Sequence, residues 1–317
     1  MESTFSRRST DDVINTYLIT TTHEDGIWGV AWGRGGRLVT GSVDNAVKIW
    51  NAEGGLEPLH TFHGHELGVI SVATDLTGRY AVSSSLDSRI KIWNMDDKTH
   101  VKTIEGEPVE VWTVACDPHG PHVATGTHAG NVHIYNTESG ERVQVLETKG
   151  KFIMSLAYSQ QGNYLASGAE NGAIHVFDTT TGRLVSTLSG HAMSVRSLSF
   201  SPDGRFLVSA SDDKRVHMYD VHHGSQVAAL AGHASWVLSV AWSPAGGSTS
   251  NVGAGAVDHI ASGSSDKRVK VWDIRAKQCL HTLDHHQDQV WGVAYNEAGT
   301  RLATVADDKS LRVFSCQ

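Results

Sequence analysis

An aromatic residue that closes a short apolar run recurs along this chain at nearly constant intervals. It occupies seven positions: Trp50, Trp93, Tyr135, Phe177, Tyr219, Trp272 and Phe314. The intervals are 43, 42, 42, 42, 53 and 42 residues, and an insertion of mostly small residues, 246–256, accounts for the long one. A fixed period of about 20–50 residues is the signature of a repeat architecture. The 317-residue chain therefore contains seven copies of one unit.

Within the units, apolar residues alternate with other residues in short runs, as in VKIW (47–50) and VHIY (132–135). Alternation with a period of two, bounded by Gly, Asp and Ser, predicts β-strands, and no window shows a sustained helical period. Each unit is then about four short antiparallel strands, which is one blade of a β-propeller. The sequence predicts an all-β fold, a seven-bladed β-propeller over residues 13–317, preceded by a flexible tail over 1–12 and carrying the insertion as a loop of blade 6.

The two ends of the repeat array predict how the ring closes. The last unit stops at FSCQ (314–317), after its third strand, while the segment VINTYLIT (13–20) alternates and precedes the first unit. We expect this N-terminal strand to complete the last blade. Such closure covers a strand edge that would otherwise invite aggregation.

Five units share four polar or aromatic positions at fixed spacing. A His lies near the start of the unit, a Ser or Thr ten residues before the closing aromatic residue, and an Asp six residues before it. We call each set a tetrad, and the five tetrads are His23, Thr40, Asp44 and Trp50; His65, Ser83, Asp87 and Trp93; His191, Ser209, Asp213 and Tyr219; His233, Ser262, Asp266 and Trp272; and His286, Thr304, Asp308 and Phe314.

This pattern resembles the WD-repeat family, and the resemblance implies a hydrogen-bonded chain that locks a tight turn to each blade. A buried His and Asp are tolerated only when each polar group has a partner. Units 3 and 4 depart from the pattern, because Ala129 and Asn171 replace the Asp, and Glu107 and Lys149 stand where the His is expected. We expect their turns to be less constrained.

Charge and composition narrow the classes of partner. The chain has 26 Lys and Arg against 34 Asp and Glu, a net charge of −8, whereas nucleic-acid binders rely on basic surfaces. The three cysteines have no paired spacing, which favours a reducing compartment. The sequence also shows no apolar run long enough for a membrane span. We expect no direct nucleic-acid contact, no membrane association, and a place in the cytoplasm and nucleus.

Catalytic and metal-binding signatures are weak. The adjacent pairs His222-His223 and His285-His286 lie where turns are expected, and neighbouring residues of a strand point to opposite faces. Ser, His and Asp are abundant because the tetrads contain them, and no G-x-S-x-G nucleophile motif occurs. We predict no catalytic residues, no cofactor and no metal, and hence a protein that is not an enzyme.

The residue five positions after each signature His, or its aligned equivalent, opens the innermost strand. In the WD-repeat family it faces the mouth of the central channel on the narrow face, so the resemblance predicts a contact patch that we call the rim: Trp28, Ile70, Trp112, Met154, Arg196, Leu238 and Trp291. Phe152 and Trp236, from the preceding turns, would add to it. Exposed aromatic and Arg side chains dominate interface energetics. The alternative is that the tryptophans merely plug the channel.

Three carboxylates stand beside this patch in the family's alignment. They precede the position of the tetrad Asp in units 4, 5 and 7, and they are Glu170, Asp212 and Asp307. Carboxylates next to an aromatic patch suit a partner segment that carries Arg beside apolar anchors. Solvated turn carboxylates are the alternative interpretation.

Longer strings resemble one branch of the family, the WD-repeat subunits of the superkiller (Ski) complex. They include HASWVLSVAW (233–242) and HQDQVWGVAY (286–295), and the likeness extends over 23–314. The resemblance implies a non-catalytic scaffold that binds a tetratricopeptide-repeat subunit and an RNA helicase subunit and assists 3′-to-5′ mRNA decay by the exosome. It also implies a role in the Paf transcription elongation complex. The rivals are a WD-repeat scaffold of another assembly, ciliary or ubiquitin-ligase, and a propeller hydrolase.

Overall fold

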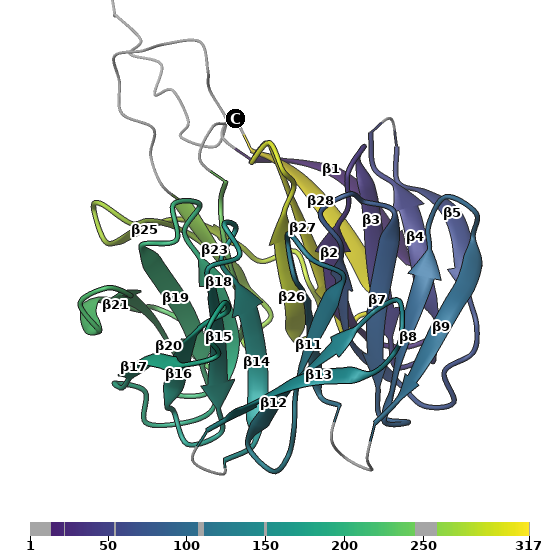
Figure 1. The fold of residues 1–317 in the computed structure, drawn as a ribbon. Coiled ribbons are helices and arrows are strands. Elements are labelled where there is room, and N and C mark those ends of the chain that lie inside the picture. The colour runs from purple at the N-terminus through teal and green to yellow at the C-terminus, as the bar shows by residue number, and fades with distance from the viewer. Residues whose placement is uncertain are drawn as a thin grey trace, which may run out of the picture.

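The structure, a computed structural model, describes the following residues: 14–21, 23–53, 55–106, 111–148, 151–244 and 259–316. In these residues 28 strands form seven four-stranded antiparallel sheets, and no helix occurs among them. The sheets follow one another around a common centre in chain order (Figure 1). The predicted all-β seven-bladed propeller is therefore confirmed.

The strands of blades 1 to 4, from the inside outward, are β2 (Ile27–Trp32), β3 (Arg37–Ser42), β4 (Val47–Asn51) and β5 (Glu57–Phe62); β6 (Val69–Thr74), β7 (Tyr80–Ser85), β8 (Arg89–Asn94) and β9 (Thr99–Glu105); β10 (Thr113–Cys116), β11 (His122–Gly126), β12 (Asn131–Asn136) and β13 (Arg142–Glu147); and β14 (Ile153–Tyr158), β15 (Tyr164–Ala169), β16 (Ile174–Asp178) and β17 (Leu184–Leu188).

The strands of blades 5 to 7, in the same order, are β18 (Val195–Phe200), β19 (Phe206–Ser211), β20 (Arg215–Asp220) and β21 (Ser225–Ala231); β22 (Val237–Trp242), β23 (His259–Ser264), β24 (Val269–Asp273) and β25 (Gln278–Leu283); and β26 (Val290–Tyr295), β27 (Arg301–Ala306), β28 (Ser310–Cys316) and β1 (Ile14–Thr21). In blade 7, β1 pairs antiparallel with β28, from Ile14 opposite Cys316 to Thr21 opposite Ser310. That the ring depends on β1 for its stability stays a prediction.

The core consists of seven apolar clusters, one between each pair of neighbouring blades. In each cluster the closing aromatic residue of one blade packs on the strands of the blade before it; Trp93 of blade 2, for example, meets Val39 and Ile49 of blade 1. Trp50 of blade 1 in turn packs with Val305 of blade 7. Each closing aromatic side chain therefore fills the space between its own blade and the preceding one. For this reason the aromatic residues recur along the sequence once per blade.

The insertion 246–256 and the tail 1–12 lie outside the described residues, as do Glu107 and Lys149.

Candidate functional site

All five tetrads form the expected hydrogen bonds between His, Ser or Thr, and Asp. In blade 6, His233 Nε2 lies 2.8 Å from Ser262 Oγ, His233 Nδ1 lies 2.9 Å from Asp266 Oδ2, and Trp272 Nε1 donates to Ser262 Oγ over 2.8 Å. The corresponding His contacts in the other four tetrads measure 2.6–3.0 Å. Phe314 of blade 7 has no polar atom to offer, so that chain ends at Thr304.

Donor and acceptor roles in the tetrads follow from chemistry. The indole of Trp272 can only donate, and the carboxylate of Asp266 can only accept, so Ser262 accepts from Trp272 and His233 donates from Nδ1 to Asp266. In three tetrads burial lowers the pKa of the His against the opposing pull of its Asp, and these are His65, His191 and His286. Each His thus has both ring nitrogens engaged within its tetrad, which makes the tetrads structural.

A β-bulge places six of the seven rim residues. The register of the innermost pair skips one residue in each of these blades, as between Ile27 and Gly29, and the skipped residue is the predicted rim residue. A bulge leaves a residue unpaired and re-aims its side chain. In blade 3 the innermost strand starts at Thr113, directly after Trp112. The local backbone thus turns the rim residues toward the channel.

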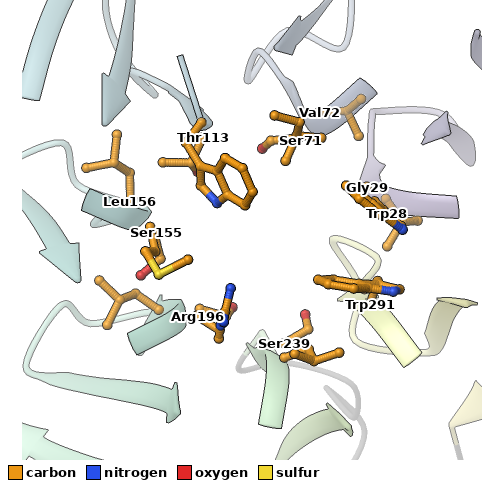
Figure 2. A pocket seen from close by; sticks show the side chains of 18 of the residues that line it. Trp28, Gly29, Ser71, Val72, Thr113, Ser155, Leu156, Arg196, Ser239 and Trp291 are labelled. Atoms are coloured by element: carbon orange, nitrogen blue, oxygen red, sulfur yellow. The ribbon is translucent and has the colours of Figure 1, made fainter. Parts of the chain in front are cut away.

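The seven rim residues line one cavity of about 390 Å³ at the mouth of the channel, together with the two residues that follow each of them. Figure 2 shows the side chains converging from all blades on an open centre. Below the rim, small residues form a second ring, and several of its hydroxyls bind the next blade; Ser155 donates to Val195 O over 2.9 Å, and Ser239 accepts from Val293 N over 3.1 Å. The mouth is therefore open and held by a rigid polar collar.

Trp28 and Trp291 form a tilted pair at this mouth, with ring centroids 4.9 Å apart (Figure 2). Trp28 Nε1 donates to Asp307 Oδ1 over 2.9 Å, which fixes the Trp28 ring from the neighbouring blade. Trp291 Nε1 is buried without a hydrogen-bond partner in the described structure. Because Trp28 already engages Asp307, that carboxylate is a positioning group as well as a potential contact.

Arg196 and Asp212 pair with each other, which corrects one expectation. Arg196 Nε and Nη2 donate to the two carboxylate oxygens of Asp212 over 2.9 and 2.8 Å, and Asp212 is only 4% exposed. The Asp212 carboxylate is thus already neutralised and is no open acceptor for a partner's Arg. The guanidinium also lies 5.8 Å from the ring centroid of Trp236, a cation–π contact.

The other residues predicted to contact a partner, on the rim or beside it, divide into exposed and buried ones. Met154 and Leu238 line the cavity but are only 9% and 5% exposed. They therefore form its buried floor and not the solvent-exposed contact surface that was expected. They are covered because their side chains pack down among the converging inner strands. Ile70 and Trp112 are half-buried, Trp236 is 45% exposed, and Glu170 is exposed.

Phe152 extends the aromatic surface over blades 3 and 4. Its ring lies 5.3 Å from that of Trp112 in an edge-on contact and 5.0 Å from that of His128. His128 was not among the predicted residues. It precedes Ala129 and so occupies in blade 3 the position that Asp212 and Asp307 occupy in blades 5 and 7. The alignment of the repeats could therefore have identified it. The predicted site residues thus gather at one mouth, with Asp212 withdrawn from it.

One cluster of potential metal ligands, His191, Asp213 and His217, occurs in blade 5. The two imidazole rings are stacked, with centroids 3.9 Å apart and planes only 8° from parallel. A metal ion binds imidazole nitrogen in the plane of the ring, and two parallel planes at this separation cannot both aim a lone pair at one ion. Moreover, both nitrogens of His191 are engaged within its tetrad. The cluster is packing, not a metal site.

No helix in the described residues is long and apolar enough to cross a membrane.

Comparison with known proteins places this geometry in a family. The model described as IFT122 first beta-propeller matches residues 12–248, and the model described as WD domain, G-beta repeat matches residues 224–273 and 277–315.

Three curated relatives resemble part of the chain. WD repeat-containing protein SL1-17 of Schistosoma mansoni is 39% identical over 26% of this chain and 30% of its own length. WD repeat-containing protein VIP3 of Arabidopsis thaliana is 37% identical over 27% of this chain and 28% of its own length. Superkiller complex protein 8 of Dictyostelium discoideum is 36% identical over 27% of this chain and 29% of its own length. The matches thus span less than a third of each relative.

The propeller model covers well over half of the chain, the repeat model covers its C-terminal units, and two of the three curated relatives are named as WD repeat-containing proteins. Seven four-stranded blades and five complete His–Ser/Thr–Asp hydrogen-bond chains agree with these matches. The chain belongs to the family of WD-repeat β-propellers.

Proposed function

We propose that this chain is a non-catalytic scaffold subunit of a superkiller complex, where it holds the tetratricopeptide-repeat and RNA helicase subunits during exosome-mediated 3′-to-5′ mRNA decay. WD-repeat propellers generally serve as protein-interaction scaffolds. The assignment to this complex is supported by the partial match to Superkiller complex protein 8 and by the strings shared with that branch. Those strings alone suggest a second role in the Paf complex, and with it a place in the nucleus as well as the cytoplasm.

The observation that carries the proposal is the aromatic channel mouth. Trp28 and Trp291 stand side by side, Trp112 and Phe152 continue the surface, and Trp236 covers Arg196. Trp and Arg are the side chains in which interface energy concentrates, and a central aromatic cluster suits an extended partner segment with apolar anchors. Nothing in this arrangement offers a nucleophile with a base beside it.

The unpaired indole N–H of Trp291 adds a directional element. A buried donor without a partner costs about 1–3 kcal/mol. The rings of Trp28 and Trp291 are in contact and Nε1 is buried, so a partner carbonyl reaches this atom only if the Trp291 ring turns on binding; the carbonyl would then accept the hydrogen bond and remove the cost. The mouth thus offers a partner stacking surface and one hydrogen bond, while Glu170 and Asp307 supply negative charge at its edge for a basic residue.

A titration of the folded protein with the tetratricopeptide-repeat subunit, followed by calorimetry, tests this proposal. We expect Trp291→Ala and Trp28→Ala to lose about 2 kcal/mol of binding each, which is about thirtyfold in Kd. The control is Leu280→Ala, an exposed apolar residue on the outer strand β25, which should bind like the unchanged protein. Unchanged affinity for both tryptophan variants would move the interface away from the mouth.

A second candidate is a scaffold of a different assembly, which is favoured by the match to the model described as IFT122 first beta-propeller. Affinity purification from cells with mass spectrometry separates the two. Recovery of the helicase and tetratricopeptide-repeat subunits supports the first, and recovery of another stable assembly without them supports the second.

A further inference from the structure

A second cavity lies between blades 2 and 3, at the opposite face from the channel mouth. Its volume is about 380 Å³, within the range of about 300–1,000 Å³ that is usual for ligand pockets. It is bounded by the loop 75–79 after β6, the loop 117–121 after β10, the residues that follow β12, and the outer strand β9. Inner strands begin at the channel rim, so the loops that follow them lie at the other face. We call this cavity the blade 2–3 crevice.

The crevice is open because blade 3 lacks an apolar side chain, which we call the plug, that other blades bury between themselves and the preceding blade. The residue two positions after the closing aromatic is Met95 in blade 2 and Val221 in blade 5, and both are buried in the cluster with the preceding blade. In blade 3 the same position is Thr137, which lines the crevice and donates its hydroxyl to Pro121 O over 3.1 Å. A side chain that is short and hydrogen-bonded to a loop cannot fill the gap between two sheets.

The floor and walls of the crevice are apolar. Val82 and Ile92 come from the sheet of blade 2, and Cys116 ends the inner strand of blade 3. At the entrance Leu76 and Val101 are 43% and 47% exposed, although both are large apolar side chains. An apolar hollow with exposed apolar side chains at its edge marks a binding surface.

The charge around the crevice is negative. Asp75, Asp117 and Glu138 line it, against Lys102, whose ammonium donates to the backbone oxygen of Glu138, and two histidines, of which His122 lies 3.3 Å from the Asp117 carboxylate. Burial, together with the carboxylates of Asp75 and Asp117, raises the pKa of the Cys116 thiol to about 12. A positive group placed at the entrance would be attracted, and a negative one repelled.

We propose that the blade 2–3 crevice is a second protein-docking site, which takes a large apolar side chain of a partner with a basic residue next to it in sequence. The apolar side chain enters the hollow that Thr137 leaves open, and the basic residue meets the carboxylates at the entrance. This site is independent of the channel mouth and of the complex proposed above, since it shares no residue with the mouth. One propeller would then engage two segments, one on each face.

Methyl NMR of the full chain tests the proposal with a dipeptide probe, acetyl-Phe-Arg-amide, against acetyl-Phe-Glu-amide. The methyl groups of Val82, Ile92 and Val101 report on the crevice, and those of Ile70 and Leu238 report on the channel mouth. We expect saturable shifts at the crevice methyls and a Kd at least about threefold lower for the Arg peptide than for the Glu peptide. Equal affinity for the two peptides, shifts only at the mouth, or no saturable shift would overturn the proposal.

Thr137→Met gives the sharpest variant, because the repeat itself supplies Met at this position in blade 2. It should fill the crevice and weaken the Arg peptide about tenfold or more while the protein keeps its melting temperature. The control is Thr179→Met at the corresponding cavity between blades 3 and 4, which shares Asp117 and His122 with the crevice but not its apolar floor, and which should leave the crevice open. Should Thr137→Met fail to fold, Glu138→Lys at an exposed position reduces the preference for the Arg peptide. Peptide binding to folded Thr137→Met at unchanged affinity would refute the site.

Discussion

Asp266→Ala removes the acceptor at the end of the blade 6 tetrad. Three donors lose their partner: His233 Nδ1, at 2.9 Å, and the backbone N–H groups of Ala234 and Arg268, at 2.9 and 3.1 Å. The His233 side chain is only 1% exposed, whereas the two backbone groups lie at an exposed turn where water can replace the carboxylate. The cost of the substitution therefore comes mainly from the histidine.

A buried donor left without a partner costs about 1–3 kcal/mol, and hydrated backbone groups add little. We expect Asp266→Ala to lower the free energy of unfolding by about 2 kcal/mol, which corresponds to about 4 °C in the melting temperature for a protein of this size. The matched control is Asn171→Ala in blade 4, at the same turn position. Asn171 only accepts from Ala173 N over 3.3 Å at an exposed site, so its loss should stay within about 0.5 kcal/mol.

The assay is thermal unfolding by scanning calorimetry, repeated at about pH 5 and about pH 3. Burial alone would raise the pKa of Asp266, but hydrogen bonds from His233 and Ala234 outweigh it and hold the pKa at about 2. A pKa below that of the unfolded chain means that Asp266 stabilises the fold above about pH 4 and loses this effect as pH falls toward 2. The difference in stability between the unchanged protein and Asp266→Ala should thus be smaller at about pH 3 than at about pH 5. Equal losses of stability for Asp266→Ala and Asn171→Ala at pH 5 would refute the role assigned to the tetrad. So would a loss for Asp266→Ala that grows as the pH falls.

Three further predictions concern the same fold. The stability of the unchanged protein should fall as pH drops below about 6.5, because the unfolded chain then binds protons that the buried imidazoles of His65, His191 and His286 resist; urea titrations across this range measure it. Removing residues 1–21, and with them β1, should lower the melting temperature and promote aggregation, visible by light scattering, because the edge of β28 is uncovered. Deleting 246–256, outside the described residues, restores the repeat period and should leave circular dichroism and melting unchanged; loss of folded protein would contradict this.

The fold was predictable because each blade packs on the preceding blade through one aromatic residue at a fixed position of the repeat. Trp50 or Phe177 closes a strand and also fills the gap to the blade before it, so the spacing of aromatics along the chain reports the spacing of sheets in space. The tetrads were predictable for the same reason. Their members lie at fixed offsets within one unit, and a hydrogen-bonded chain needs only local geometry.

The details of the mouth were not predictable, because they depend on contacts between units. The bond from Trp28 to Asp307 joins residues of blades 1 and 7, which become neighbours only when the ring closes. The pairing of Arg196 with Asp212 follows from a bulge and an adjacent turn that converge, whereas the family resemblance placed the two residues at the channel mouth as separate contacts. By contrast, the missing plug at Thr137 is visible in the aligned repeats once the role of Met95 in the structure is known.

The departures from the repeat are concentrated in two blades. Blades 3 and 4 carry Ala129 and Asn171 in place of the tetrad Asp and threonine in place of an apolar plug, and a cavity lies on each side of blade 3. On the opposite face the same two blades supply Trp112 and Phe152 to the aromatic surface. Elements that give up internal hydrogen bonds and packing are the least stable parts of a fold, and binding surfaces are drawn from such parts. A partner that fills these gaps would restore the lost packing locally, so its binding should slow amide hydrogen exchange in blades 3 and 4 more than in the other five blades.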